Sequence, residues 1–210
     1  MSNHCCQNVK FDGVSASYKR ILWIVIAINA IMFAVEISAG LVAQSQALKA
    51  DALDFLADSA TYAISLYVIG LSIQVRSNAA LFKGYSLCLI GLWVLASTLY
   101  RLFITATPEP VLMGSVATLA LAANLVSVLL LLKYRDGDSN VRSVWLCSRN
   151  DAIGNVAVLI AATAVWQTQT PWPDLIVALL MATLFLSSAL QIIKQAKEEQ
   201  NLAAIRVHND

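Results

Sequence analysis

Charged residues are too few in this chain to cover the surface of a water-soluble protein. Of its 210 residues only 13% are charged and 59% are hydrophobic, and the mean hydropathy is +0.69. Soluble domains carry about 25% charged residues, so most of this surface must face lipid. The 14 basic and 13 acidic residues nearly balance, which also excludes a basic nucleic-acid-binding surface. We therefore predict an integral membrane protein whose partner is the lipid bilayer and not nucleic acid.

Six stretches of the chain are apolar enough to cross a membrane. A transmembrane helix needs about 20 apolar residues to span a hydrocarbon core of roughly 30 Å. We therefore predict an all-α, polytopic protein with six transmembrane helices. Their expected ranges are 21–43, 46–75, 81–104, 112–133, 141–166 and 173–195. The resulting segments are an N-terminal tail (1–20), a six-helix domain (21–195) and a short C-terminal tail (196–210).

Lysine and arginine fall mostly on one side of the predicted membrane. With the N-terminus inside, the cytoplasmic segments hold eleven of them and the outer loops hold only Lys49 and Arg101. The eleven are Lys10, Lys19, Arg20, Arg76, Lys83, Lys133, Arg135, Arg142, Lys194, Lys197 and Arg206. Basic residues in short loops mark the cytoplasmic side. Both termini are therefore expected to be cytoplasmic, and we expect a bacterial inner membrane.

Acidic residues cluster within two of the predicted spans, where an ionised side chain costs about 2.5–3.5 kcal/mol at the helix centre. In the second predicted helix, Asp51, Asp54 and Asp58 are spaced i, i+3 and i+7, which places them on one face. In the fifth, Cys147 and Asp151 are one turn apart at i and i+4. Groups this costly need a partner or a function.

These two helices are expected to be antiparallel, so that their acidic residues meet at one depth. Ser45 and Asn140 are suitable N-caps from which to start them. From these starts, the distances of Asp54 and Asp151 from opposite faces sum to roughly 30 Å, the thickness of the hydrocarbon core. The group expected at mid-membrane consists of Asp54, Asp58, Cys147 and Asp151.

Three carboxylates and a thiolate in a medium of low dielectric constant repel one another unless a cation or protons neutralise them. Oxygen and sulfur ligands in this number suit a tetrahedral transition-metal ion such as Zn²⁺, Co²⁺ or Cd²⁺. Mg²⁺ and Ca²⁺ prefer more oxygen ligands and no thiolate. Because these ligands bind as anions, metal capture expels protons and protonation drives the metal off. The ligand types therefore predict a divalent-metal site that exchanges metal for protons.

At these positions the sequence resembles the cation diffusion facilitator family of divalent-metal/proton antiporters. The resemblance covers the membrane region: six spans, the segment GLVAQSQALKADAL (40–53), and an i, i+4 pair on each of helices 2 and 5. It implies that Asp54, Asp58, Cys147 and Asp151 occupy the family's four transport-site positions. It also implies that helices 2 and 5 rock between inward-open and outward-open states. The expected function is secondary transport rather than enzyme catalysis, with the metal ion as cargo and no cofactor.

The chain departs from the family pattern in two ways. Cys147 stands where the family usually has His, which favours a softer metal ion. We also expect a short form without the family's C-terminal cytoplasmic domain. A homodimer of such a form would have to associate through the transmembrane region.

Each residue of the site also has a structural interpretation. Asp54 and Asp58 would form a buried pair neutralised by Arg149 or Lys49, and Cys147 would be a small packing residue. Asp51 fits an exit path or a supporting group behind the ligands, and equally a partner of Lys49. For the remaining polar positions we favour structural roles. Asn155, Asn124 and Glu36 are expected to make contacts between helices, with Arg149 as the counter-charge of Glu36. The alternatives are an auxiliary metal ligand for Asn155 and a proton relay for Glu36. Asp174 is expected to be the N-cap of helix 6.

The N-terminal tail offers one imidazole and two thiols within three residues. His4, Cys5 and Cys6 would suffice to collect a soft metal ion near the cytoplasmic mouth, although a disordered polar tail is the interpretation we favour. No framework spacing links the four cysteines, so all are expected to be free thiols.

Two other functions fit part of the pattern. Paired carboxylates within the membrane also suit an intramembrane enzyme of the aspartyl-protease type, in which they share a proton and activate water. A non-transporting membrane metal sensor would bind the ion without moving it. We favour the transporter because four ligands converge instead of two, and no Gly-Asp motif frames Asp151.

Overall fold

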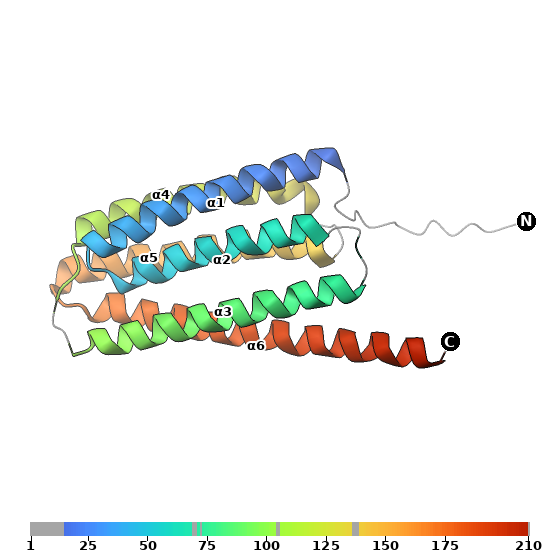
Figure 1. Ribbon diagram of the computed structural model, residues 1–210. Helices are drawn as coiled ribbons and strands as arrows, with labels where there is room; N and C mark the ends of the chain where they lie inside the picture. The colour runs from blue at the N-terminus through green and yellow to red at the C-terminus, as the bar shows by residue number, and fades with distance from the viewer. Residues whose placement is uncertain (1–14, 69–70, 72, 104–105, 136–138, 210) are drawn as a thin grey trace, which may run out of the picture.

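The protein is a bundle of long helices. The computed structural model describes residues 15–68, 71, 73–103, 106–135 and 139–209. The helices are α1 (Ala16–Val42), α2 (Gln46–Val68), α3 (Ile73–Arg101), α4 (Pro110–Leu131), α5 (Ser139–Thr168) and α6 (Trp172–Asn209), with a short 3₁₀ turn, η1 (Leu132–Tyr134), after α4. They lie alongside one another, and the start of α1 and the end of α6 lie at the same end of the bundle (Figure 1). The prediction of an all-α fold is confirmed.

Two predicted boundaries differ from the structure around α3 and α6. The second predicted helix, 46–75, ends at Val68, and residues 76–78, expected to form a turn, lie inside α3. The reason is that Ser77 is fully buried and donates a hydrogen bond to the carbonyl of Ala196 (2.7 Å). Polar residues in this segment therefore join two helices and do not end one.

The expected C-terminal tail, 196–210, continues α6 as far as Asn209. The amide of Gln200 donates to the side chain of Asn78 (2.7 Å), so this extension is bonded to the first turns of α3. A tail predicted from its polarity is therefore helical over the part that the structure describes, because α3 offers it polar partners.

Glycines allow α3 and α6 to approach closely. A Cβ atom on Gly91 would lie 3.0 Å from Cγ of Leu186, and one on Gly84 would lie 2.6 Å from Cγ1 of Ile193. Small residues permit such contacts between membrane helices. These two helices run side by side along one edge of the bundle (Figure 1).

Large apolar side chains cover the outside of the bundle. Ile31, Leu89, Trp93 and Ile160 are each more than 60% exposed. Within the described residues, four helical segments are long and apolar enough to cross a membrane by length and composition: Ala16–Val42, Ser77–Arg101, Pro110–Tyr134 and Trp172–Asn201. The helices α2 and α5 are not among them, and they carry the acidic residues predicted as metal ligands. In α2 only Leu56 and Tyr67 are exposed large apolar residues, which fits a helix packed largely against others.

Asp174 caps a different helix from the one predicted. It lies in the first turn of α6, but its carboxylate accepts hydrogen bonds from the backbone N–H groups of Gln46 (2.7 Å) and Ala47 (3.0 Å) and from the hydroxyl of Ser45. Ser45 in turn accepts from the N–H of Leu48 (3.0 Å), as predicted for an N-cap. The prediction that Asp174 caps helix 6 is wrong because the unpaired N–H groups of α2 are buried beside it. The first turn of α2 is thereby fixed to α6.

Candidate metal site

A cavity of about 540 Å³ lies between α2, α3, α5 and α6. All four predicted ligands line it: Asp54 and Asp58 from α2, and Cys147 and Asp151 from α5. The remaining wall includes apolar side chains of α3 and α6, among them Phe82, Leu87, Ile90, Met181, Leu184, Phe185 and Ile192. Helices from separate parts of the sequence thus gather three carboxyl groups and one thiol around a single space.

Asp151 is the centre of the acidic contacts. Its carboxyl group lies within hydrogen-bonding contact of both Asp54 and Asp58. Carboxylates are only acceptors when ionised, so each such contact requires a proton or a cation between the oxygens. The arrangement is therefore suited to hold either protons or a positively charged ion.

Tyr62 holds one of these carboxyl groups in place. Its hydroxyl donates a hydrogen bond to Oδ2 of Asp58, one helical turn earlier on α2. The same hydroxyl is 3.4 Å from Oγ of Ser148 on α5. Tyr62 is fully buried, so its hydroxyl has little freedom to choose other partners. The sequence interpretation missed this residue, although its i+4 position after Asp58 puts it on the acidic face of the helix.

Lys83 brings a positive charge to the same cavity. Its side chain lines the cavity from α3, and its ammonium group donates a hydrogen bond to Oγ of Ser65 (2.7 Å). Sequence reasoning counted this lysine only as a marker of the cytoplasmic side. Nothing in its sequence context distinguishes it from the lysines of the helix ends, because the cavity is formed by helices remote in sequence.

Asp54, Asp58, Cys147 and Asp151 line one cavity, but their ligand atoms do not converge on a single point. In the described ranges, no three or more Asp, Glu, Cys or His side chains are arranged to hold a metal ion. The four side chains therefore surround one space without forming a closed ligand set, and their role as ligands stays a prediction. An ion in this cavity would draw the side chains toward it.

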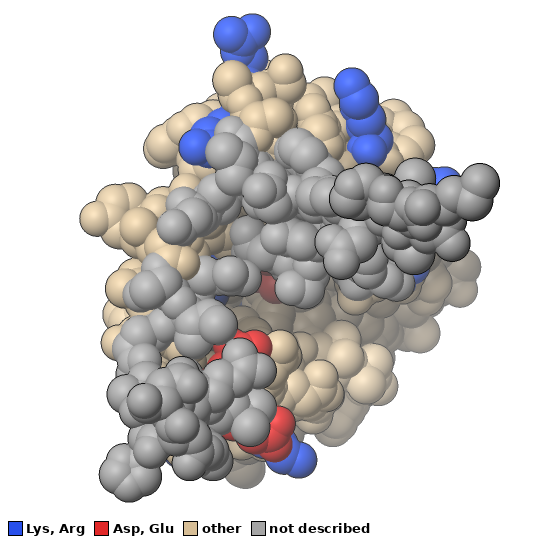
Figure 2. Space-filling model, turned by 90° about the vertical axis from the view of Figure 1, so that its right-hand side faces the viewer, with Lys and Arg blue, Asp and Glu red and all other residues tan. Residues whose placement is uncertain are grey.

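The cavity occupies the half of the bundle nearer the chain termini. Its lining residues run from Asp54 toward the end of α2, from Gly154 back toward the start of α5, and from Met181 to Ile192 along α6. The end of α2, the start of α5 and the end of α6 all lie at the end of the bundle where α1 starts (Figure 1). Seen onto that end, Lys and Arg side chains project from the periphery, and acidic side chains are visible at the middle and in the lower part of the face (Figure 2).

The predicted accessory residues lie beside this cavity and do not line it. Asn155 donates a hydrogen bond from Nδ2 to Oδ2 of Asp51 (2.6 Å) and accepts one from Nδ2 of Asn124 (3.0 Å), so it contacts other helices, as favoured above. Asp51 faces the carboxyl group of Glu36 on α1. Arg149, expected as a counter-charge, is exposed and donates to Oδ1 of Asn150 (3.2 Å). The charged groups that act on Glu36 are instead Asp51 and Asp54.

The proposed metal-collecting residues His4, Cys5 and Cys6 lie outside the described residues. Cys88 and Cys147 are both free thiols. Cys88 lies on α3 and is not among the residues that line the cavity.

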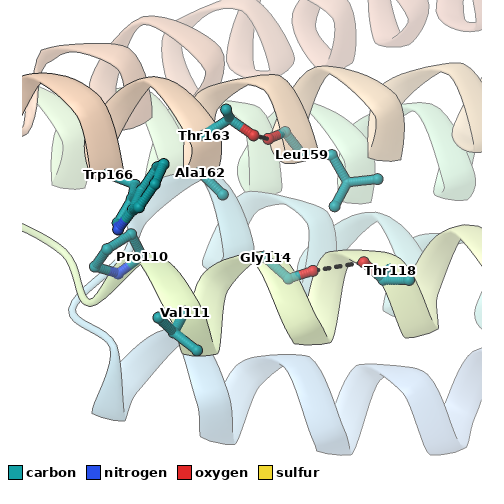
Figure 3. A pocket seen from close by; sticks show the side chains of 8 residues that line it. All are labelled: Pro110, Val111, Gly114, Thr118, Leu159, Ala162, Thr163 and Trp166. Carbon is teal, nitrogen blue, oxygen red and sulfur yellow. Dashed lines mark hydrogen bonds between the residues drawn. The ribbon is translucent and has the colours of Figure 1, made fainter.

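A second cavity, of about 320 Å³, lies between α4 and α5 (Figure 3). None of its lining residues is ionisable; they are Pro110, Val111, Gly114, Thr118, Leu159, Ala162, Thr163 and Trp166. Its two hydroxyl groups donate to backbone carbonyls of their own helices, Thr118 to Gly114 (2.8 Å) and Thr163 to Leu159 (3.0 Å). This cavity offers no charged group to a cation.

Ionisable side chains that face an internal cavity in a helical bundle with an apolar exterior are characteristic of membrane proteins with ion or substrate pathways. Comparison with known proteins assigns the family. The family model described as cation efflux transmembrane domain matches residues 22–199. The chain therefore belongs to the cation efflux family, a family of membrane transporters rather than enzymes, and the resemblance noted in the sequence is confirmed.

Individual relatives agree with this family. The metal cation efflux system protein CzcD of Cupriavidus metallidurans is 26% identical over 190 residues, which are 85% of this chain and 60% of the relative. The zinc transporter ZitB of Pectobacterium atrosepticum is 32% identical over 200 residues, 88% of this chain and 62% of the relative. The cadmium, cobalt and zinc/H(+)-K(+) antiporter of Bacillus velezensis is 24% identical over 201 residues, 88% of this chain and 64% of the relative.

The chain spans about three fifths of the length of these curated relatives. The family model that matches this chain describes a transmembrane domain, and the three relatives are bacterial. The protein is accordingly an integral membrane protein of the bacterial inner membrane.

Proposed function

We propose that this protein exports a divalent transition-metal cation from the cytoplasm in exchange for protons. The observation that carries the proposal is the gathering of Asp54, Asp58, Cys147 and Asp151 around one cavity between α2 and α5. The relatives are named as transporters of zinc, or of cadmium, cobalt and zinc, which supports a metal cargo. The four side chains are the proposed ligands.

In this proposal all six helices cross the membrane and both termini lie in the cytoplasm. Four helices qualify as spans by composition, and α2 and α5 would cross as the two ligand-bearing helices between them. The basic residues at the end of the bundle that carries the termini support a cytoplasmic position for that end. The cavity then lies in the cytoplasmic half, so that metal enters from the cytoplasm.

The ligand types favour Zn²⁺, Co²⁺ or Cd²⁺ as the cargo. A thiolate beside carboxylates suits these ions better than Mg²⁺ or Ca²⁺, which prefer oxygen ligands alone. Because each proposed ligand binds the metal as an anion, protons compete for the same atoms. Protons arriving from the outer side would release the ion and restore the protonated carboxyl contacts around Asp151.

A transport assay in sealed vesicles tests this function. We expect purified protein in proteoliposomes to move Zn²⁺ or Cd²⁺ faster when a pH gradient drives protons the opposite way, and proton movement to require the metal. Reversing the pH gradient should reverse the preferred direction of metal flux. Metal binding without any flux would identify a non-transporting sensor and contradict the proposal.

Tyr62 should tune the site without being a ligand. In Tyr62→Phe the carboxyl group of Asp58 loses the hydrogen bond that orients it, so we expect metal affinity to fall by roughly 10- to 100-fold, as is usual when a group supporting a ligand is removed. Isothermal titration with Cd²⁺ measures this change. The matched control is Tyr67→Phe, because Tyr67 lies on the same helix but is 80% exposed. Equal effects of the two substitutions would contradict a positioning role for Tyr62.

A further inference from the structure

A second pair of carboxyl groups lies one helical turn from the cavity, between α1 and α2. Glu36 on α1 is completely buried, and Asp51 on α2 is only 1% exposed. Neither residue lines the cavity. Asp51 precedes Asp54 by one turn along α2, so the pair lies toward the end of the bundle that carries the α1–α2 turn, away from the termini.

The side-chain amides of Asn155 and Asn124 are hydrogen-bonded beside this pair. Nδ2 of Asn155 donates to Oδ2 of Asp51 (2.6 Å), and Oδ1 of Asn155 accepts from Nδ2 of Asn124 (3.0 Å). The hydrogen bonds therefore turn the NH₂ group of Asn155, and not its oxygen, toward the carboxyl pair. Asn155 thus supplies the pair with one hydrogen-bond donor.

Glu36 receives no such donor. Both of its carboxylate oxygens are buried, and neither accepts a hydrogen bond from any donor in the described part of the chain. Its carboxyl group is nevertheless within hydrogen-bonding contact of the carboxyl group of Asp51. Two ionised carboxylates have only acceptors to offer each other, so this contact becomes a hydrogen bond only when one of the two carries a proton.

We propose that Glu36 and Asp51 form a buried proton-binding site, separate from the metal cavity, in which one proton is shared between the two carboxyl groups. The proton is carried by Glu36, which donates to Asp51, while Asn155 donates to the other oxygen of Asp51. The protonated pair then has a single negative charge and satisfied contacts. Uptake of this proton forms only the O–H bond of Glu36, and its release breaks only that bond.

The charges that face this site are few. From α2, Asp51 contacts Glu36, and Asp54 acts on it only through its charge. From α4, which contains no ionisable residue, the neighbouring polar group is the neutral amide of Asn124, and from α5 it is that of Asn155. No cation among these groups replaces the proton, and the negative charge of Asp54 favours keeping it.

The proton-binding site stands on its own geometry, whereas its use in transport rests on the proposed function. In that function the pair lies between the metal cavity and the outer face of the membrane, on the side from which protons enter. A proton held there would be available to the carboxyl groups of the cavity once the metal ion has left. Metal bound in the cavity does not touch Glu36 and therefore leaves this proton in place.

Infrared spectroscopy distinguishes this proton from those of the metal site. Saturating the protein in lipid nanodiscs with Cd²⁺ strips protons from the ligating carboxyl groups, and titration calorimetry on the same sample reports whether Cd²⁺ binds. We expect the Cd²⁺-saturated protein at neutral pH to keep the carbonyl-stretch band of a protonated carboxylic acid. Glu36→Gln should abolish that band, and Glu36→Asp, which keeps a carboxyl group, should retain it at a shifted position. Glu109→Gln, at an exposed acid, should leave it unchanged.

The two proposals fail differently in this experiment. Absence of Cd²⁺ binding contradicts the metal function. In that case the proton site is tested by the difference between the infrared spectra of metal-free wild type and metal-free Glu36→Gln. A wild-type spectrum without the band, or a band that persists in Glu36→Gln, overturns the proton site while leaving the metal function intact. Loss of Cd²⁺ binding in both Glu36 variants would also overturn it, because the residue would then belong to the metal site.

Discussion

Replacing Asp58 by Asn is expected to abolish metal transport. The substitution keeps the size of the side chain and an oxygen that can accept the hydrogen bond of Tyr62, but it removes the negative charge that attracts the ion. It also leaves Asp151 without one of its two acidic contacts. We expect metal affinity to fall by more than roughly 100-fold, beyond what the loss of a merely supporting group costs.

Isothermal titration and vesicle flux with Cd²⁺ measure this loss. The matched control is Glu199→Gln, which makes the same change from acid to amide on the exposed part of α6. It should retain wild-type affinity and flux. Unchanged transport by Asp58→Asn, with the control behaving normally, would remove Asp58 from the site.

Cys147 should decide which metal ions the protein prefers. Thiolate is the only soft ligand among the four, so Cys147→Ser should weaken binding of Cd²⁺ much more than binding of Co²⁺. We expect the ratio of the two affinities to fall at least tenfold, which corresponds to about 1.4 kcal/mol. Competition titrations with the two ions give this ratio directly.

The chain supplies its own control for this substitution. Cys88 is also a free, partly buried thiol in a transmembrane helix, but it does not line the cavity. Cys88→Ser should leave the Cd²⁺ to Co²⁺ ratio unchanged. If both serine variants behave like wild type, Cys147 is a packing residue and the softness of the site has another origin.

The all-α fold could be predicted from the sequence because long apolar stretches are typical of transmembrane helices. Of the predicted spans, four coincide with helices that are apolar and long enough to cross a membrane in the described part of the chain. Helix ends were less predictable wherever polar residues bond to another helix. The sequence predicts Ser77 and Gln200 outside the helices, yet each bonds across the α3–α6 contact. Asp174 was assigned to the wrong helix for the same reason, since its partners at the start of α2 are more than a hundred residues away.

Part of the site was also predictable. The spacing of Asp54 and Asp58 on α2, and of Cys147 and Asp151 on α5, places each pair on one face, and one depth calculation aligns the two helices. Lys83 was not predictable, because its place in the cavity depends on how α3 packs against α2. The partner of Glu36 was missed because sequence reasoning sought a basic counter-charge, whereas the structure pairs it with a second acid.

X-ray absorption at the zinc edge tests the central claim, that the metal ion lies between α2 and α5. In a background with Cys5→Ser and Cys6→Ser, only Cys88 and Cys147 remain as thiols. We predict one sulfur at about 2.3 Å from Zn²⁺ together with oxygen ligands at about 2.0–2.2 Å. That sulfur should disappear with Cys147→Ser and remain with Cys88→Ser. A zinc site without sulfur, or one whose sulfur survives Cys147→Ser, would contradict the account.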